Sequence, residues 1–334
     1  MILTEAKGYV LSLELEDCNS VTGLAHKMVE LEFTNMELLH AVITCGMPIQ
    51  RLTPAYMNTR KMEILYKMFL VETALEVNGD RLQKSKRTAY LDSSEKSVIS
   101  YYLGMFFTKL ISRKMFDVDY LTHLNTIERT YGGGFIDYFD NEWRPDMIGY
   151  CMSEDSWSVW EAKGGSNKRI QALDKGSQQV AAIASVNGQK PNPAAVCMTY
   201  YDHGYLCAIV RDPEGNDGEH LNISEENYFK SYYKPVFELF QEQGMQIKGE
   251  DVEICLRVPD FSGESAEKGT TGQEGKTGAG ANTKEREIYI GMPAKLMQHI
   301  AKQEYVMMRE LCYQEKRDYP DGRYVGADGI YIRR

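Results

Sequence analysis

Two acidic residues and one lysine are the clearest candidates for chemistry in this sequence. Asp146 follows a proline, and Glu161 and Lys163 come about fifteen residues later. Two carboxylates can hold a hard divalent cation such as Mg²⁺ through oxygen ligands. Such an ion polarises a phosphate and lowers the pKa of a bound water, while a neighbouring lysine offsets the negative charge that develops. These residue types therefore suit the hydrolysis of a phosphodiester bond.

The three side chains can meet if the chain between them folds back on itself. Aromatic and aliphatic residues flank a cluster of turn formers at 153–156, which predicts a β-hairpin. With those four residues as the loop, Asp146 lies opposite Lys163 at roughly 5 Å and diagonal to Glu161 at roughly 7–8 Å. Because side chains alternate along a strand, all three then share one face.

The motif Pro145-Asp146, followed by Glu161-Ala162-Lys163, resembles that of the PD-(D/E)XK superfamily of restriction-endonuclease-like nucleases. The resemblance covers about residues 92–212, including the hairpin, two glycines after the lysine and a following helix. It implies an α/β fold whose core is a mixed sheet flanked by helices. It also implies Mg²⁺ or Mn²⁺ bound by the Asp and the Glu, with the lysine assisting the water or the phosphate.

The same residues have a purely structural alternative. Asp146 can stand at a strand start, and Glu161 and Lys163 can form a surface pair on an edge strand. The apolar neighbours Trp160 and Ala162 instead indicate a largely buried strand. Buried charge is costly without a partner or a metal, which favours a functional site.

The resemblance implies further site residues on the helices around the motif. Some superfamily members carry an acid on the first core helix, where Glu95 is the first candidate and Glu128 the second. Some place a glutamine on the helix after the lysine, where Gln178 and Gln179 lie, and we take Gln179 as the catalytic candidate. A helix cap or an exposed helix face is the alternative for each of these residues.

The charge balance limits how the protein can bind nucleic acid. The formal net charge is −10 over 334 residues, so the chain is not a generally basic nucleic-acid binder. DNA must meet a local basic groove or arrive with a partner or a metal. Lys168 and Arg169, at the start of the helix after the motif, can contact phosphate or simply be exposed.

The composition excludes several other classes of protein. With 43% hydrophobic residues the chain can bury a sizeable core. Seven scattered cysteines contain no CxxC pair, so neither a zinc site nor a disulfide framework is indicated. We find no signal peptide and no apolar segment of membrane-spanning length, so we expect no membrane partner and a cytoplasmic location.

The patterning divides the chain into three regions. Residues 1–91 are expected to be mainly helical, with one strand at 9–15 and helical patterns at 20–45 and 54–77. Residues 92–215 are expected to form the nuclease-like core.

Within the core, the first element is a helix over 92–114 that begins with capping and acidic residues. A strand at 120–124, the motif hairpin, a helix over 168–187 and strands at 195–201 and 205–210 follow. Helix, strand, strand, strand, helix, strand is the core order of the resembled superfamily.

Residues 216–334 are expected to form an α+β extension. The patterns predict helices over 224–243 and 294–314 and a strand at 252–258. Residues 261–285 have almost no apolar side chains, and we expect a flexible loop there.

The function expected from this sequence is metal-dependent endonuclease activity on DNA. The arrangement looks closest to bacterial restriction or host-defence proteins, which implies an anti-phage role by resemblance. A non-catalytic module that binds nucleic acid or a partner protein, and a repair or recombination nuclease, are the alternatives. A partner protein or a homo-oligomer is compatible with all three.

Overall fold

A computed structural model provides the structure of the protein. It describes residues 2–5, 7–18, 26–45, 59–131, 143–213, 218–259, 285–304, 307–308 and 322–334, without the side chains of 128–131. Residues 261–284 of the expected flexible loop lie outside the described residues.

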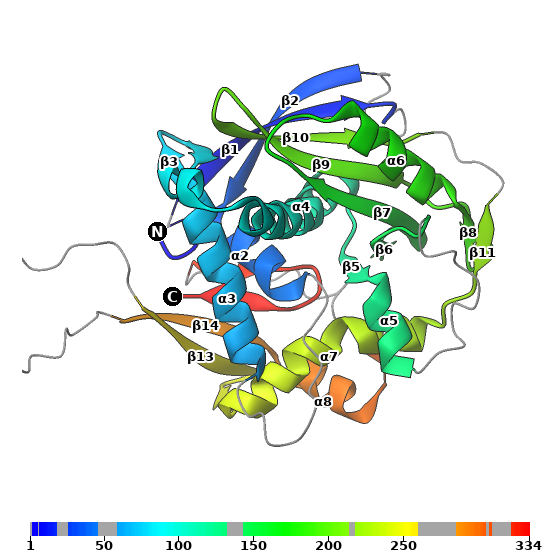
Figure 1. Cartoon of the computed structure of the whole chain (residues 1–334). Coiled ribbons are helices and arrows are strands. Elements are labelled where there is room, and N and C mark those ends of the chain that lie inside the picture. Colours follow the sequence, from blue (N-terminus) through cyan, green and yellow to red (C-terminus); the bar gives the residue numbers. More distant parts are fainter. Residues whose placement is uncertain are drawn as a thin grey trace, which may run out of the picture.

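A large mixed sheet dominates the structure, in the strand order β2-β1-β4-β10-β9-β7-β6-β5, with β3 paired to β4 (Figure 1). The pairings of β1 with β10 and of β7 with β9 are parallel, and most of the others are antiparallel. In chain order the strands are β1 (Gly8–Glu16), β2 (His26–Thr34), β3 (Leu75–Asn78), β4 (Arg81–Lys84), β5 (Tyr120–His123), β6 (Met147–Cys151), β7 (Ser156–Gly164), β9 (Ala194–Asp202) and β10 (Tyr205–Arg211).

Helices cover both faces of this sheet, as expected for an α/β protein. On β9, Ala195 and Cys197 belong to the main core on the side of α4, whereas Val196 and Met198 cluster with Leu173 of α6. The helices before the C-terminal region are α2 (Asn35–Thr44), α3 (Thr59–Ala74), the 3₁₀ helix η1 (Lys86–Tyr90), α4 (Ser93–Phe116), α5 (Leu124–Tyr131) and α6 (Ile170–Ala181).

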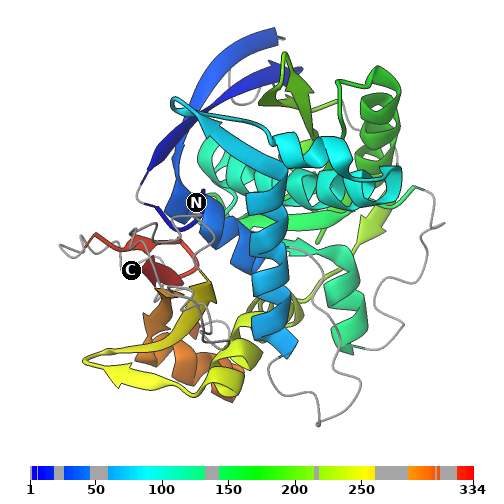
Figure 2. The same cartoon turned by 60° about the vertical axis from the view of Figure 1, so that its left-hand side comes forward.

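The C-terminal elements form a second sheet of order β12-β13-β14-β16-β15, on the opposite side of the molecule from β2 (Figure 2). A separate two-stranded sheet pairs β8, which precedes β9 in the chain, with β11, which follows β10. The elements are β8 (Ile183–Val186), β11 (Glu219–Leu221), α7 (Glu225–Gln243), β12 (Gln246–Lys248), β13 (Asp251–Pro259), β14 (Glu285–Pro293), α8 (Ala294–Lys302), β15 (Tyr324–Val325) and β16 (Tyr331–Arg333).

A buried polar network attaches this C-terminal part to the rest of the molecule. The side chain of Asp328 is fully buried and lies 3.0 Å from His40 Nε2 of α2. It also accepts a hydrogen bond of 2.5 Å from the Tyr232 hydroxyl of α7. Since a buried carboxylate is stable only when its oxygens are paired, these contacts fix the last hairpin against α2 and α7.

The N-terminal region differs from the mainly helical prediction. The strand expected at 9–15 is confirmed as β1, but residues 26–34 form strand β2 instead of part of a helix over 20–45. β2 pairs with β1 along its whole length, and Thr34 then caps α2 through a capping box with Glu37. Because β1 and β4 pair with β10, the division at residue 91 does not follow the architecture.

Two predicted helices end early. The helix expected over 168–187 is α6, which ends at Ala181, and β8 follows it directly. The helix expected over 294–314 is α8, which ends at Lys302 because Gln303 adopts the left-handed conformation (φ 62°). Residues 307–308 are again helical, and residues 305–306 and 309–314 lie outside the described residues.

The motif hairpin forms, but its register differs from the prediction by two residues. Tyr150 pairs with Trp157, so Asp146 stands level with Glu161 instead of Lys163. The turn is shifted because Asp155 adopts the left-handed conformation (φ 51°) and Ser156 already pairs with Cys151. A shift of two residues leaves every side chain on its predicted face.

Glycines allow α4 to approach β7 very closely at the end of the motif strand. A Cβ on Gly104 would lie 2.6 Å from the carbonyl oxygen of Lys163, and a Cβ on Gly164 would overlap the carbonyl oxygen of Ser100. Backbone therefore packs on backbone here, which brings the first half of α4 beside the motif residues.

We expect Gly164→Ala to destabilise the fold by about 1–3 kcal/mol, because neither backbone can move aside without disturbing its element. Urea denaturation followed by circular dichroism measures this change. Gly8→Ala in strand β1 is the matched control, since the nearest atom to its added Cβ is 3.9 Å away. Equal stability of the two variants would contradict the tight packing of α4 on β7.

Candidate active site

Asp146, Glu161 and Lys163 converge where β6 begins and β7 ends. The backbone N–H of Asp146 donates to Glu161 Oε2 (2.9 Å), and the N–H of Ala162 donates to Asp146 Oδ2 (3.0 Å). Lys163 Nζ forms an ion pair with Glu161 Oε1. Main-chain donors thus hold both carboxyl groups in place, and the lysine lies beside them.

Burial and mutual repulsion govern the charges of the two acids. Burial raises the pKa of Asp146, although the Ala162 N–H and the Lys163 ammonium favour its charged form. Burial and then the charge of Asp146 raise the pKa of Glu161. One lysine cannot neutralise two carboxylates, so the site favours an additional positive charge.

Gln179 of α6 completes the group. Its Oε1 accepts a hydrogen bond from Lys163 Nζ (2.8 Å), and its Nε2 donates to the carbonyl oxygen of Arg144 (3.0 Å). The glutamine side chain therefore links α6 to the lysine and to the segment that leads into Asp146. Gly176, one turn earlier, lets α6 pack closely on β9 beside Glu161, because a Cβ there would lie 2.5 Å from Val196 Cγ2, with Glu161 Cγ at 3.5 Å.

The site opens into a pocket of about 490 Å³ between α4 and the loop that follows β7. Asp146, Glu161 and Lys163 line its inner end. The α4 wall consists of Ser93, Lys96, Ser97, Ser100 and Tyr101, and the other wall of Gly164, Gly165, Ser166 and Arg169. A polyanionic ligand can thus reach the carboxylates between walls that carry hydroxyl groups and positive charge.

The structure does not bring Glu95 to this site. Glu95 is exposed, accepts a hydrogen bond from the Asp92 N–H (2.9 Å) as part of the capping box of α4, and lines a separate groove. Glu128 belongs to α5, and its side chain lies outside the described residues. Gln178 is exposed, whereas its neighbour Gln179 is buried in the site.

The two basic candidates at the start of α6, Lys168 and Arg169, have different surroundings in the structure. Lys168 forms ion pairs with Glu14 Oε2 (2.7 Å) and Glu16 Oε1 (3.7 Å) of β1. Arg169 lines the pocket instead. The α4 wall was missed from the sequence, although Ser93, Ser97 and Ser100 have the i, i+4, i+7 spacing of one helix face.

Asp146 and Glu161 fit a hard divalent cation. They offer only oxygen ligands, each carboxyl group has lone pairs beyond those used in its hydrogen bonds, and the site favours added positive charge. Asp146 and Glu161 would hold the ion, and it would supply a polarised phosphate and a more acidic bound water.

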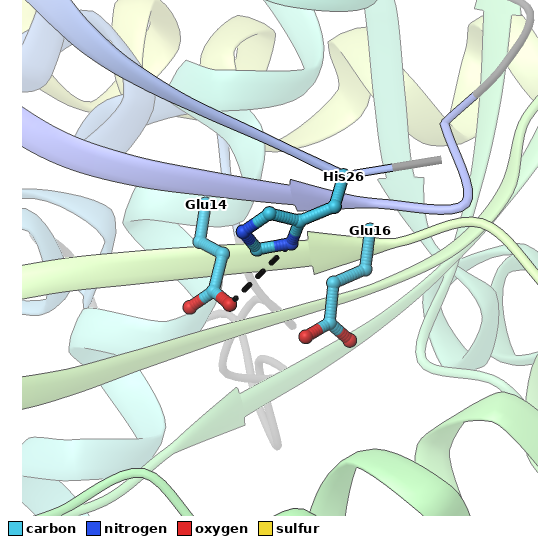
Figure 3. A group of neighbouring side chains, drawn as sticks. All are labelled: Glu14, Glu16 and His26. Carbon is cyan, nitrogen blue, oxygen red and sulfur yellow. Dashed lines mark ion pairs between the residues drawn. The ribbon is translucent and has the colours of Figure 1, made fainter. Parts of the chain in front are cut away.

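A second group of possible metal ligands lies at the far end of β1. Figure 3 shows Glu14 and Glu16 of β1 with His26 of β2, and an ion pair of 3.8 Å joins His26 Nδ1 to Glu14. Although burial favours protonated Glu16, its ion pairs with Arg211 and Lys168 hold its pKa below the ordinary value. Because both carboxylates already have cationic partners, this group serves to attach α6 and β10 to β1.

Comparisons of the chain with protein-family models, with curated protein sequences and with solved structures found no match. Among the described residues, no helix is long and apolar enough to cross a lipid bilayer. The chemistry of the site must therefore be inferred from its geometry.

We expect Asp146→Asn to stabilise the metal-free protein in a pH-dependent way. Folding raises the pKa values of Asp146 and Glu161. The contribution of these two groups to stability is therefore fully present at low pH and is lost as the pH rises through the raised values. The asparagine removes one charge but keeps an oxygen for the Ala162 N–H. In EDTA, its melting temperature should exceed that of the parent at about pH 8, and the gain should shrink toward about pH 4.

The matched control is Asp202→Asn, at an exposed position at the end of β9. This variant removes one negative charge at a position that has no buried acidic neighbour. Its melting temperature relative to the parent should therefore not depend on pH in this way. A gain for Asp146→Asn that did not change with pH would contradict the repulsion between the two acids.

Proposed function

We propose that the protein is a metal-dependent nuclease with a restriction-endonuclease-like core, and that it cleaves phosphodiester bonds in DNA. One observation carries the proposal: the buried carboxyl group of Glu161, the half-buried carboxyl group of Asp146 and a lysine meet at the end of β7, and they face an open pocket with basic and hydroxyl-bearing walls. The bacterial defence role implied by the sequence resemblance is part of this proposal.

Each residue has a distinct role in this mechanism. Asp146 and Glu161 hold the divalent cation, and the backbone N–H groups of Asp146 and Ala162 keep both carboxyl groups in place. Lys163 offsets the charge that grows on the phosphate or orients the attacking water. Gln179 keeps the Lys163 ammonium from turning out into the pocket mouth.

The order of elements agrees with this function. α4 precedes β5, β6 and β7, and α6 precedes β9 and β10, in the sequence expected from the resemblance, with α5 between β5 and β6 and β8 between α6 and β9 as additional elements. The carboxylates lie at a strand end that α4 and α6 approach from opposite faces of the sheet. A substrate can thus reach them without opening the fold.

We expect the purified protein to cleave DNA with Mg²⁺ or Mn²⁺ and not in EDTA. Asp146→Asn, Glu161→Gln and Lys163→Met should each lower the cleavage rate by about 10²-fold or more, the scale of losing one group aimed at transition-state charge. Linear, circular and single-stranded DNA serve as substrates, with products resolved on gels.

Lys175→Met is the matched control for Lys163→Met, because Lys175 is exposed on α6 and lies outside the pocket lining. It should cleave at the parental rate. Calorimetry should show weaker Mn²⁺ binding for Asp146→Asn and Glu161→Gln than for Lys163→Met. Undiminished cleavage by a folded Glu161→Gln variant would refute the nuclease proposal and leave a non-catalytic binding module.

Neighbouring glutamines provide a separate test of lysine positioning. We expect Gln179→Ala to reduce cleavage by about 10–100-fold, the usual loss when a group that orients an active-site residue is removed. Gln178→Ala, one residue earlier and exposed, should leave the rate unchanged. The cleavage rate constants under single-turnover conditions measure both effects, and equal rates for the two variants would exclude a role for Gln179.

A further inference from the structure

We propose that the pocket binds a single strand of nucleic acid, with the sugar–phosphate backbone along the α4 wall and an unpaired base against the ring of Tyr101. This proposal rests on the proposed function and specifies its substrate class. It adds Lys96, Arg169 and Tyr101 as binding residues that the catalytic mechanism does not use.

The α4 wall offers donors suited to phosphates. Ser93, Ser97 and Ser100 lie on one face of the helix, and Lys96 lies beside them. The Ser97 hydroxyl donates to the Ser93 carbonyl oxygen (2.8 Å), so Ser93, Ser100 and Lys96 supply the donors for a phosphate. Among the residues that line this wall, none is acidic, since Glu95 is on the opposite side of the helix and lines another groove. Hydroxyl groups and an ammonium bind phosphate oxygens in any nucleotide sequence.

The opposite wall adds a second positive charge. Within the described residues, neither Lys96 nor Arg169 forms an ion pair, although both line the pocket. Lys168, next to Arg169, is held by Glu14 and Glu16. Lys96 and Arg169 therefore line the same pocket as the carboxylates, from α4 and from the segment before α6, and are placed to bind phosphates next to the one that is cleaved.

Tyr101 gives the reason to infer an unpaired strand. It lines the pocket and is 43% exposed, while its ring packs edge-on against Tyr102 at 5.2 Å between centroids. An aromatic ring held in this way and open on one side can stack with a base, which is possible only if the base is not already stacked in a duplex.

The overall charge supports the same inference. With a net charge of −10, the protein gains little long-range attraction for a duplex. Stacking on an aromatic ring provides affinity that depends little on salt, and two local cations suffice to align one strand.

Binding of fluorescent oligonucleotides to full-length Asp146→Asn protein, which should not cleave them, tests the proposal. Anisotropy is measured in EDTA with a single strand and with a duplex of the same sequence, over a range of salt concentrations. We expect tighter binding of the single strand. Adding Tyr101→Ala should weaken it by on the order of tenfold without changing the salt slope, and Tyr101→Phe should not weaken it.

Adding Lys96→Ala or Arg169→Ala should instead reduce the slope of log K against log salt by about 0.7 each. Lys295→Ala on α8 is the charge-matched control, because Lys295 is exposed and remote from the pocket lining. Tyr66→Ala is the aromatic control. Tyr66 is 46% exposed and also packs edge-on against Tyr102, but it lines the groove on the other side of α4.

The outcomes separate this proposal from the proposed function. If the parent protein cleaves DNA but binds the duplex better, or if Tyr101→Ala and Tyr66→Ala bind equally well, the single-strand proposal is overturned and the nuclease stands. If single strands bind as described but the parent protein never cleaves them, the single-strand binding proposal is supported and the nuclease proposal is overturned. If neither binding nor cleavage is found, both are overturned.

Discussion

The arrangement of the site depends on the repulsion between two carboxyl groups that the fold holds together. Glu161 is buried and Asp146 is half-buried, and like charges interact strongly where water is partly excluded. Two backbone N–H groups, Lys163 and Gln179 offset part of this cost but leave the pair short of positive charge. Apolar residues here would avoid this cost, and the unfavourable pair is consistent with the proposed metal site.

The surrounding architecture keeps these groups from moving apart. β7 runs through the middle of the sheet, between β6 and β9, and cannot shift without breaking both pairings. α4 approaches it through Gly104 and Gly164, and α6 approaches the other face through Gly176. The carboxylates are thus positioned by rigid elements instead of loops, which suits chemistry that tolerates only small displacements.

Short-range patterns predicted the convergence of the three motif side chains better than they predicted the fold. The shared face of Asp146, Glu161 and Lys163 followed from strand alternation, which a shift of two residues does not disturb. The register itself could not be predicted, because it also depends on Asp119, a residue outside the hairpin whose carboxylate accepts a hydrogen bond from the Met152 N–H. Glu95 was assigned by resemblance, but its local capping role prevailed.

The N-terminal error has a different cause. Residues 29–34 alternate strictly between apolar and polar side chains, which is a strand pattern, and the predicted helix over 20–45 ran across it. Pairing with β1 along the whole of β2 confirms the strand. The close approach of α4 to β7 depends on Gly104 and Gly164, which are far apart in the sequence. No local sequence pattern could therefore predict it.

The parallel pairing of β1 with β10 has a consequence for the synthesis of the protein. Ser12 lies opposite Cys207, so β1 leaves the ribosome long before its partner exists. Until then, β1 can pair only with β2 and, at the single bridge of Val10 with Arg81, with β4. Most of its length is therefore part of a two-stranded ribbon, and such ribbons are marginally stable in water. The apolar side of β1, with Leu11, Leu13 and Leu15, and its unpaired edge would be open to other nascent chains. A chaperone that binds this ribbon during translation would therefore protect the one edge on which completion of the main sheet depends.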